Sequence, residues 1–345
     1  MDDRLTAQPT PEDADVSPRG LAHGGRLEAA RRLFPRAPEP FIDLSTGINP
    51  ISYSVPLLSS EAWRRLPEPE AIAALEAVAA RAYGVSDASM VVAAPGTQSM
   101  ISLIPGLMPK PPAAILVPTY GEYARAFALR GSRIVEAESL DRLGDARSVV
   151  LCNPNNPDGR RLEATAILEA LRARRVEGLV VVDESFADLE DKALSLAPHL
   201  PQPGIIVLRS LSKTFGLAGL RLGFALAAPD LAATLRAALG PWPVSGPAIE
   251  IGKQALADRA WLQAAKQRLS RDVQRLDALL DQSGLVIVGG TLLFRLATSG
   301  RAAALFQRLG EAGILVRHFE QWPDWLRFGI PGSEEAWRRL ADAHP

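Results

Sequence analysis

The sequence predicts an α/β protein in which a large domain with a mainly parallel sheet is followed by a smaller α+β domain. The chain has 345 residues, more than a single hydrophobic core usually serves. Short apolar runs alternate with helical stretches, and the pattern changes after about residue 228 to a long helical region followed by further strand-like segments. We expect a disordered polar tail at 1–18, an arm at 19–45 that joins the small domain, a large domain at 46–240 and a small domain at 241–345.

Within the large domain, a helix is expected at 71–82, where AIAALEAVAARA is rich in helix formers and follows Pro69, a residue suited to a first helical turn. Five apolar runs follow, each short and ending in turn residues, as expected for strands buried on both faces of a parallel sheet. Amphipathic stretches between them, such as 161–173, supply crossover helices. The runs are MVVAA (90–94), AAILVP (113–118), SVVLC (148–152), LVVVD (179–183) and IIVLRS (205–210).

The small domain is expected to start with a long helical region at 247–282, rich in Ala, Leu, Gln, Arg and Asp, and to end with a helix at 333–343. The mixture of helices with strands between these two segments predicts an α+β arrangement. The expected strands are LVIVG (285–289), LLFRLA (292–297), ILVRHF (314–319) and WLRFGI (325–330).

Composition excludes several classes of partner and location. Lys and Arg total 38 against 39 Asp and Glu, a balance that argues against a nucleic acid or an anionic membrane as the main partner. The single cysteine, Cys152, cannot form an intrachain disulfide and is expected to be a small buried hydrophobe. The first residues of the sequence contain no apolar core segment, so we do not expect a secretory signal, and no apolar run reaches the roughly 18 residues of a membrane span. We therefore expect a soluble cytoplasmic protein.

Polar residues follow several of the expected strands, where ligands collect in α/β sheets. Lys213 follows the run at 205–210, so partial burial can lower its pKa enough to make it a nucleophile. Ser210, Ser212 and Arg221 supply two hydroxyls and a guanidinium, which suit a dianionic phosphate. The alternative is a solvated lysine in a turn.

Two further strand ends carry groups that suit an aromatic cofactor. Asp183 can pair with a protonated pyridine nitrogen, an interaction worth roughly 4 kcal/mol at about 4 Å and an effective dielectric constant near 20. It can equally be a helix cap or a salt-bridged strand end. The Asn156 amide can bind a phenolic oxygen, although NPNNPDG (153–159) is also an ordinary Pro/Asn/Gly turn.

The run at 90–94 leads into Gly96 and Thr97, where a glycine lets backbone amides approach an anion at the start of a helix. A capping turn explains this string almost as well. Tyr120, after the run at 113–118, can stack on a ring or be an ordinary packed tyrosine.

Taken in order, these strings resemble the fold-type I, aminotransferase-like family of pyridoxal-phosphate enzymes over about residues 20–343. The resemblance implies that Lys213 holds pyridoxal 5′-phosphate as a Schiff base and carries protons. It also implies that Asp183 pairs with the pyridine nitrogen, Asn156 with O3′, and that Tyr120 stacks on the ring. No metal is expected. The positions implied for the cofactor phosphate are Gly96, Thr97, Ser210, Ser212 and Arg221. One departure is Phe186, where many relatives carry a tyrosine that binds O3′.

The string His23-Gly24-Gly25-Arg26 before DLSTGINP (43–50) resembles the threonine-phosphate decarboxylases of cobalamin biosynthesis, which are similar to histidinol-phosphate aminotransferases. Arg26 departs from the usual asparagine, whereas Phe186 fits this branch. The resemblance implies decarboxylation of L-threonine O-3-phosphate to (R)-1-amino-2-propanol O-2-phosphate by a homodimer with active sites at its interface. A histidinol-phosphate-type aminotransferase and a catalytically silent scaffold are the alternatives.

The same resemblance implies a substrate site. Arg327 would bind the α-carboxylate as a planar fork, and Arg317 the substrate phosphate. Both could instead be strand arginines in surface ion pairs, and His23 could be a turn histidine. The implied substrate residues are His23, Gly24, Asn49, Asn156, Arg317 and Arg327.

Overall fold

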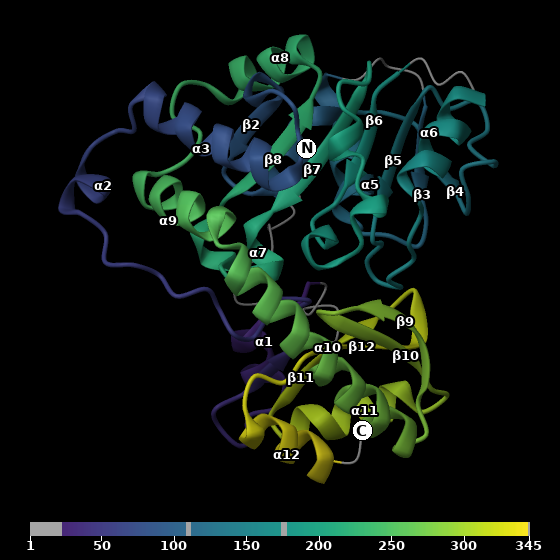
Figure 1. Ribbon diagram of the computed structural model, residues 1–345. Coiled ribbons are helices and arrows are strands. Elements are labelled where there is room, and N and C mark those ends of the chain that lie inside the picture. The colour runs from purple at the N-terminus through teal and green to yellow at the C-terminus, as the bar shows by residue number, and fades with distance from the viewer. Residues whose placement is uncertain (1–22, 108–111, 174–177, 344–345) are drawn as a thin grey trace, which may run out of the picture.

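The computed structural model describes residues 23–107, 112–173 and 178–343, so the predicted tail at 1–18 lies outside the described residues. Within these ranges the strands form one seven-stranded and one five-stranded sheet, and the α/β fold class is confirmed (Figure 1). The larger sheet contains β2 (Val91–Ala94), β3 (Ala113–Leu116), β4 (Ile134–Ala137), β5 (Ser148–Cys152), β6 (Val180–Asp183), β7 (Ile205–Ser210) and β8 (Gly223–Ala227).

The larger sheet has the order β2-β8-β7-β6-β5-β3-β4 and is parallel except for β8, which runs antiparallel to both neighbours. The five predicted strands are confirmed, with ends that differ by at most two residues. Two strands were missed. β8 (GFALA) has no β-branched residue, and β4 is an edge strand that exposes Glu136, so neither shows the pattern of a buried strand.

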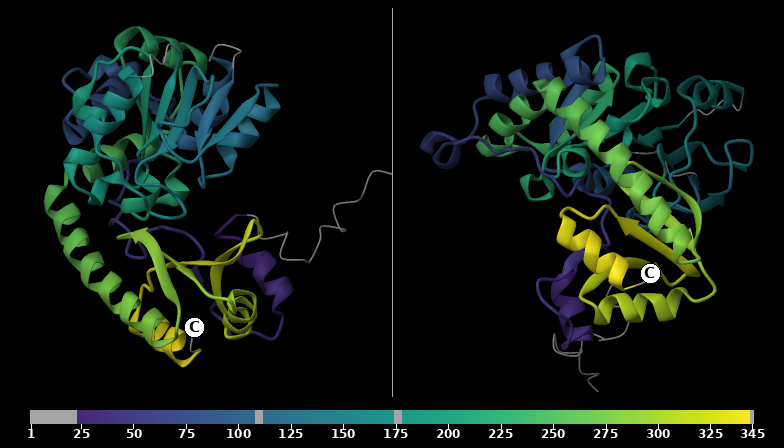
Figure 2. Two further views of the ribbon diagram at one scale, coloured as in Figure 1. Left: turned by 90° about the vertical axis from the view of Figure 1, so that its right-hand side faces the viewer. Right: turned by 60° about the horizontal axis from the view of Figure 1, so that its bottom comes forward.

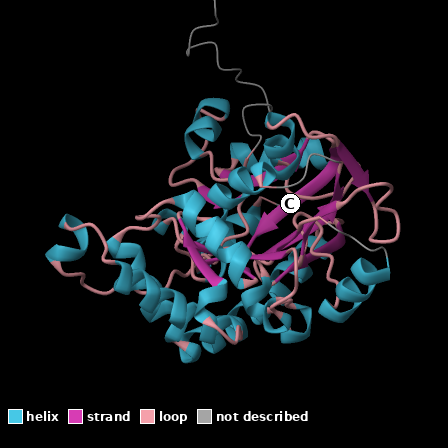
Figure 3. Cartoon of the chain, turned by 90° about the horizontal axis from the view of Figure 1, so that it is seen from above, coloured by secondary structure: helices cyan, strands magenta, loops and turns pink. Residues whose placement is uncertain are grey.

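Helices cover both faces of the larger sheet (Figure 3). Alternate residues of a strand face opposite sides, so Val180 and Val182 pack into one core cluster and Val181 into the other. The predicted helix at 71–82 is confirmed, with Pro69 in its first turn and Gly84 at φ 74° at its end. The helices around this sheet are α3 (Pro69–Tyr83), α4 (Thr97–Leu103), α5 (Glu122–Leu129), α6 (Ala164–Ala173), α7 (Leu211–Thr214), α8 (Pro229–Leu239) and α9 (Gly246–Ala257).

The five-stranded sheet has the order β1-β11-β12-β10-β9, and β1, from the N-terminal arm, pairs in parallel with β11. Its strands are β1 (Ile42–Leu44), β9 (Val286–Thr291), β10 (Phe294–Thr298), β11 (Ile314–Phe319) and β12 (Trp322–Gly329). The remaining helices are α1 (Leu27–Leu33), α2 (Ser60–Arg64), α10 (Arg259–Gln282), α11 (Ala302–Glu311) and α12 (Glu334–Asp342).

The helical region predicted at 247–282 is two helices, α9 and α10. Asp258 separates them and caps α10 by accepting a hydrogen bond of 2.9 Å from the Trp261 N–H. The predicted strand at 292–297 begins only at Phe294, because Leu293 lies in a turn that the Thr291 hydroxyl stabilises at 3.1 Å.

The core packing bears on how the chain divides into domains. Val244 and Ile249, which follow residue 240, pack with the larger sheet, whereas α10 contributes Leu269 to the core of the smaller one. Figure 2 shows α10 running from one body to the other. We therefore propose that the division falls within α10. Among the described helices, none has the length and apolar content needed to cross a membrane.

Candidate active site

The carboxyl ends of β5, β6 and β7 lie side by side because these strands are parallel neighbours. They border a cavity of about 250 Å³, called here the inner chamber. Most of the predicted cofactor residues therefore meet in one place, although they come from separate parts of the chain. The predicted cofactor residues that line the inner chamber are Thr97, Tyr120, Asn156, Asp183, Ser210, Ser212, Lys213 and Arg221. The predicted substrate residues His23, Gly24 and Arg327 line it as well.

Lys213 lies in α7, the single helical turn that follows β7. The Ser210 hydroxyl caps this turn by accepting from the Ser212 N–H at 3.2 Å. Burial, reinforced by the positive charge of Arg327, lowers the pKa of Lys213 to about 8. At pH 8 about half of such amines are neutral, against roughly 0.4% at the ordinary pKa near 10.4. The lysine can therefore act as a nucleophile near neutral pH.

Asp183 ends β6 and is 7% exposed. Its Oδ1 accepts from the N–H and the hydroxyl of Ser185, at 2.9 and 2.5 Å. Its Oδ2 accepts from the Tyr123 hydroxyl at 2.9 Å. Tyr123 was not predicted as a site residue. The feature of the sequence that could have identified Tyr123 is its position three residues after Tyr120, at the start of a helix that follows a strand end.

The residues predicted for the cofactor phosphate come from three tightly packed segments. Gly96 has φ 78°, and a Cβ placed there would lie 2.6 Å from Arg221 Nη2. A Cβ on Gly223 would lie 2.8 Å from the Thr97 backbone nitrogen. Glycine at these positions thus lets the Arg221 guanidinium pack against residue 96 and the Thr97 backbone against residue 223. This arrangement offers a planar cation and several donors to an anion.

Arg327, on β12, is 7% exposed and donates to Asn156 Oδ1 and, at 2.8 Å, to the Ser45 carbonyl. Burial lowers its pKa to about 9, and Arg317, its register partner on β11, adds repulsion. Its buried position and neutral hydrogen-bond partners do not fit the alternative of a surface ion pair. The Asn156 oxygen is occupied, so its Nδ2 is the atom that can donate to a ligand.

A second cavity of about 290 Å³, the outer chamber, adjoins the inner one. The hairpin of β11 and β12 supplies Arg317, His318 and Trp322 to its wall. Arg317 is half-buried, its guanidinium carbon lies 5.1 Å from the centroid of the Phe319 ring, and burial lowers its pKa. The residues that line both chambers are His23, Gly24, Tyr120, Asn156 and Arg327.

His23 and Gly24 line both chambers, and their contacts reach both sheets. His23 Nε2 lies 3.3 Å from Glu122 Oε1, on the side of the larger sheet. On the other side, a Cβ on Gly24 would lie 2.4 Å from the Ser45 carbonyl oxygen, so the backbone is held against β1. This segment is therefore placed to cover a ligand in the chambers.

Asn49 does not line either chamber, contrary to its predicted place in the substrate site. It is 1% exposed, and its amide donates to the Thr214 carbonyl at 2.8 Å and accepts from Arg268 at 2.7 Å. Its N–H donates to the Lys213 carbonyl at 2.9 Å. Asn49 therefore supports α7 from behind, and we do not include it in the proposed substrate site.

Phe186, the departure noted in the sequence, lines the inner chamber beside the lysine. Its ring centroid lies 5.8 Å from Lys213 Nζ and 5.3 Å from the centroid of Phe294. The side chain gives the lysine an apolar neighbour. Cys152 is buried as predicted, next to the Thr119 hydroxyl at 3.2 Å, and burial raises the pKa of its thiol.

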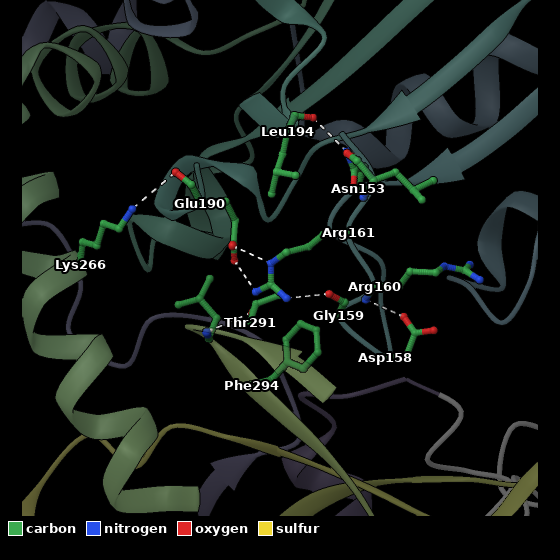
Figure 4. A network of polar contacts seen from close by, with 12 residues as sticks. Asn153, Asp158, Gly159, Arg160, Arg161, Glu190, Leu194, Lys266, Thr291 and Phe294 are labelled. Atoms are coloured by element: carbon green, nitrogen blue, oxygen red, sulfur yellow. Dashed lines mark hydrogen bonds and ion pairs between the residues drawn. The ribbon is translucent and has the colours of Figure 1, made fainter. Parts of the chain in front are cut away.

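The loop that carries Asn156 is fixed by polar contacts behind the site (Figure 4). Arg161 forms a fork on the Glu190 carboxylate, at 2.8 and 2.9 Å, and donates to the Gly159 carbonyl at 2.9 Å. A Cβ on Gly159 would lie 2.3 Å from the Gly290 carbonyl oxygen, so the loop contacts the smaller sheet at this point. These contacts hold Asn156 against Arg327.

Known proteins share both the sequence pattern and the fold. Residues 40–343 match the family described as aminotransferase class I and II. Threonine-phosphate decarboxylase from Sinorhizobium sp is 43% identical over 329 residues, which cover 94% of this chain and 97% of that protein. The protein of that name from Pseudomonas aeruginosa is 41% identical over 324 residues, covering 93% and 96%.

A crystal structure of histidinol-phosphate aminotransferase from Sinorhizobium meliloti, in complex with pyridoxal-5′-phosphate, superposes with a TM-score of 0.83. It is 22% identical and covers 99% of this chain and 98% of that one, so it shows the shared fold. The family match and the two relatives agree with the strand-end pattern described above. The chain belongs to the aminotransferase class I and II family.

Proposed function

We propose that this chain binds pyridoxal 5′-phosphate in the inner chamber and decarboxylates L-threonine O-3-phosphate. The product would be (R)-1-amino-2-propanol O-2-phosphate, a precursor of the aminopropanol arm of cobalamin. The observation that carries this proposal is a lysine with a lowered pKa in one cavity with a buried carboxylate, beside a chamber that holds two neighbouring arginines. The two relatives named threonine-phosphate decarboxylase support the choice of reaction.

The residues of the inner chamber fit each part of this cofactor. Lys213 suits an aldehyde, the Asp183 carboxylate suits a protonated ring nitrogen, and Asn156 Nδ2 suits a phenolic oxygen. Tyr120 would lie against the ring, and Ser210, Ser212, Thr97 and Arg221 would hold the phosphate. When bound, the cofactor supplies an electron sink for the bond that breaks at the substrate Cα.

The two arginines would orient the substrate. Arg327 lies on the wall shared by both chambers and would bind the α-carboxylate, whereas Arg317 lies in the outer chamber and would bind the phosphate. His23 and Gly24 would cover the bound substrate and exclude water. Lys213 Nζ would carry the proton that replaces carbon dioxide on Cα.

The direct test is product analysis of the purified protein incubated with pyridoxal phosphate and threonine phosphate. We expect release of carbon dioxide and formation of aminopropanol phosphate, identified by mass spectrometry. The reaction should proceed without consuming a 2-oxo acid. A requirement for stoichiometric 2-oxoglutarate, with formation of glutamate, would instead identify an aminotransferase.

We also propose that the chain forms a homodimer. The segment around α2 extends away from the larger body (Figure 1). It exposes large apolar side chains before, within and just after α2. Leu57 is fully exposed, and Trp63 and Leu66 are 68% and 62% exposed. Apolar area of this kind is commonly covered in an interface. Light scattering coupled to size exclusion should give about twice the monomer mass of 37.0 kDa.

A further inference from the structure

The Asp183 carboxylate has one hydrogen-bonding position left for a ligand. Each carboxylate oxygen accepts about two hydrogen bonds. Oδ1 already accepts two from Ser185, at 2.9 and 2.5 Å, while Oδ2 accepts one from the Tyr123 hydroxyl at 2.9 Å. A ring N–H that pairs with Asp183 must therefore use Oδ2, the oxygen that Tyr123 already contacts.

Tyr123 is held so that its hydroxyl is a fixed donor. The side chain is 2% exposed, and its ring meets Tyr120 edge-on with centroids 6.5 Å apart. Burial, followed by the negative charge of Asp183, raises the pKa of Tyr123 well above its ordinary value, so the hydroxyl keeps its proton. A donor to a carboxylate stabilises the ionised form and makes the carboxylate a weaker base.

We propose that Tyr123 is a positioning residue that keeps the shared proton of the Asp183–cofactor pair on the ring nitrogen of pyridoxal phosphate. This inference rests on the proposed function. An oxygen that already accepts from the Tyr123 hydroxyl is held as an acceptor, so Oδ2 accepts from the ring N–H without taking its proton. Without that hydroxyl, the proton shifts from the ring nitrogen toward Oδ2, and the ring becomes a poorer electron sink.

The test compares Tyr123→Phe with Tyr83→Phe. Tyr83 is also a buried tyrosine, but it contacts Arg209, with the guanidinium carbon 4.4 Å from the ring centroid. Each protein is loaded with pyridoxal phosphate labelled with ¹⁵N in the ring, and the nitrogen resonance is recorded. Tyr123→Phe should move this resonance toward the neutral pyridine position, because the hydroxyl that donates to Asp183 Oδ2 is lost. Tyr83→Phe should leave the resonance unchanged.

A second variant distinguishes the loss of the hydrogen-bond donor in Tyr123→Phe from a folding defect. Introducing 4-aminophenylalanine at position 123 keeps the ring and an N–H donor, and it should restore most of the wild-type resonance. A Tyr123→Phe protein with the wild-type resonance would overturn this inference alone. A wild-type protein that takes up no pyridoxal phosphate would overturn the proposed function as well.

Discussion

Replacing Arg317 by alanine should change how strongly the enzyme prefers L-threonine O-3-phosphate over L-threonine. The guanidinium is half-buried in the outer chamber, where a substrate phosphate would lie. A charge-assisted hydrogen bond contributes about 1.5–3 kcal/mol, which corresponds to roughly 10- to 150-fold in kcat/KM. Because unphosphorylated threonine never makes this contact, Arg317→Ala should lower kcat/KM for threonine phosphate by that factor and leave threonine nearly unchanged.

Two other arginines of the same sheet serve as controls. Arg327→Ala should impair both substrates alike, because both carry the α-carboxylate. Arg295 lines neither chamber and is paired with Asp277 at 2.6 Å, so Arg295→Ala should not change the ratio between the substrates. The measurement is steady-state kcat/KM for the two substrates with all four proteins. An equal loss on both substrates in Arg317→Ala would refute the phosphate role.

Three further predictions concern the cofactor residues. Lys213→Ala should abolish activity and the near-visible absorbance of the bound cofactor while the far-ultraviolet circular dichroism of the fold stays unchanged. A borohydride-reducible absorbance in this variant would contradict the assignment. Asp183→Asn should still bind cofactor but lose most activity, and a wild-type kcat would make Asp183 structural. The rate at which the apoenzyme binds cofactor should rise with pH and level off above about 8, because Lys213 is neutral above its pKa; a stopped-flow rate independent of pH from 7 to 9 would contradict this.

Much of the candidate site could be predicted because it consists of short polar strings directly after apolar runs. Lys213 follows β7 and Asp183 ends β6, and parallel pairing of neighbouring strands brings such ends together regardless of their separation in sequence. The small-sheet arginines were predicted from resemblance alone. Their burial depends on the packing of two sheets, which strand periodicity does not encode.

The residues that were missed or misplaced depend on contacts between distant segments. Tyr123 contacts Asp183 from 60 positions away, and a helical tyrosine in an apolar sequence is equally suited to plain core packing. Asn49 stands in a polar string near the predicted substrate residues, yet its side chain points behind α7 toward Thr214. The domain division also depends on contacts between distant segments. The sequence of α9 shows that one face of the helix is buried, but it does not show which of the two sheets that face packs against.

The pairing of Arg317 with Arg327 is itself an argument for an anionic ligand. These residues stand directly opposite one another on antiparallel strands, an arrangement that is destabilising for like charges. A shift of register by one residue would turn one guanidinium to the other face of the sheet and relieve the repulsion. The hairpin instead keeps both charges beside the chambers, with Arg327 buried and Arg317 half-buried. A substrate with two separate anionic groups, such as a carboxylate and a phosphate, can place one group beside each guanidinium, which an amino acid with a single anionic group cannot do.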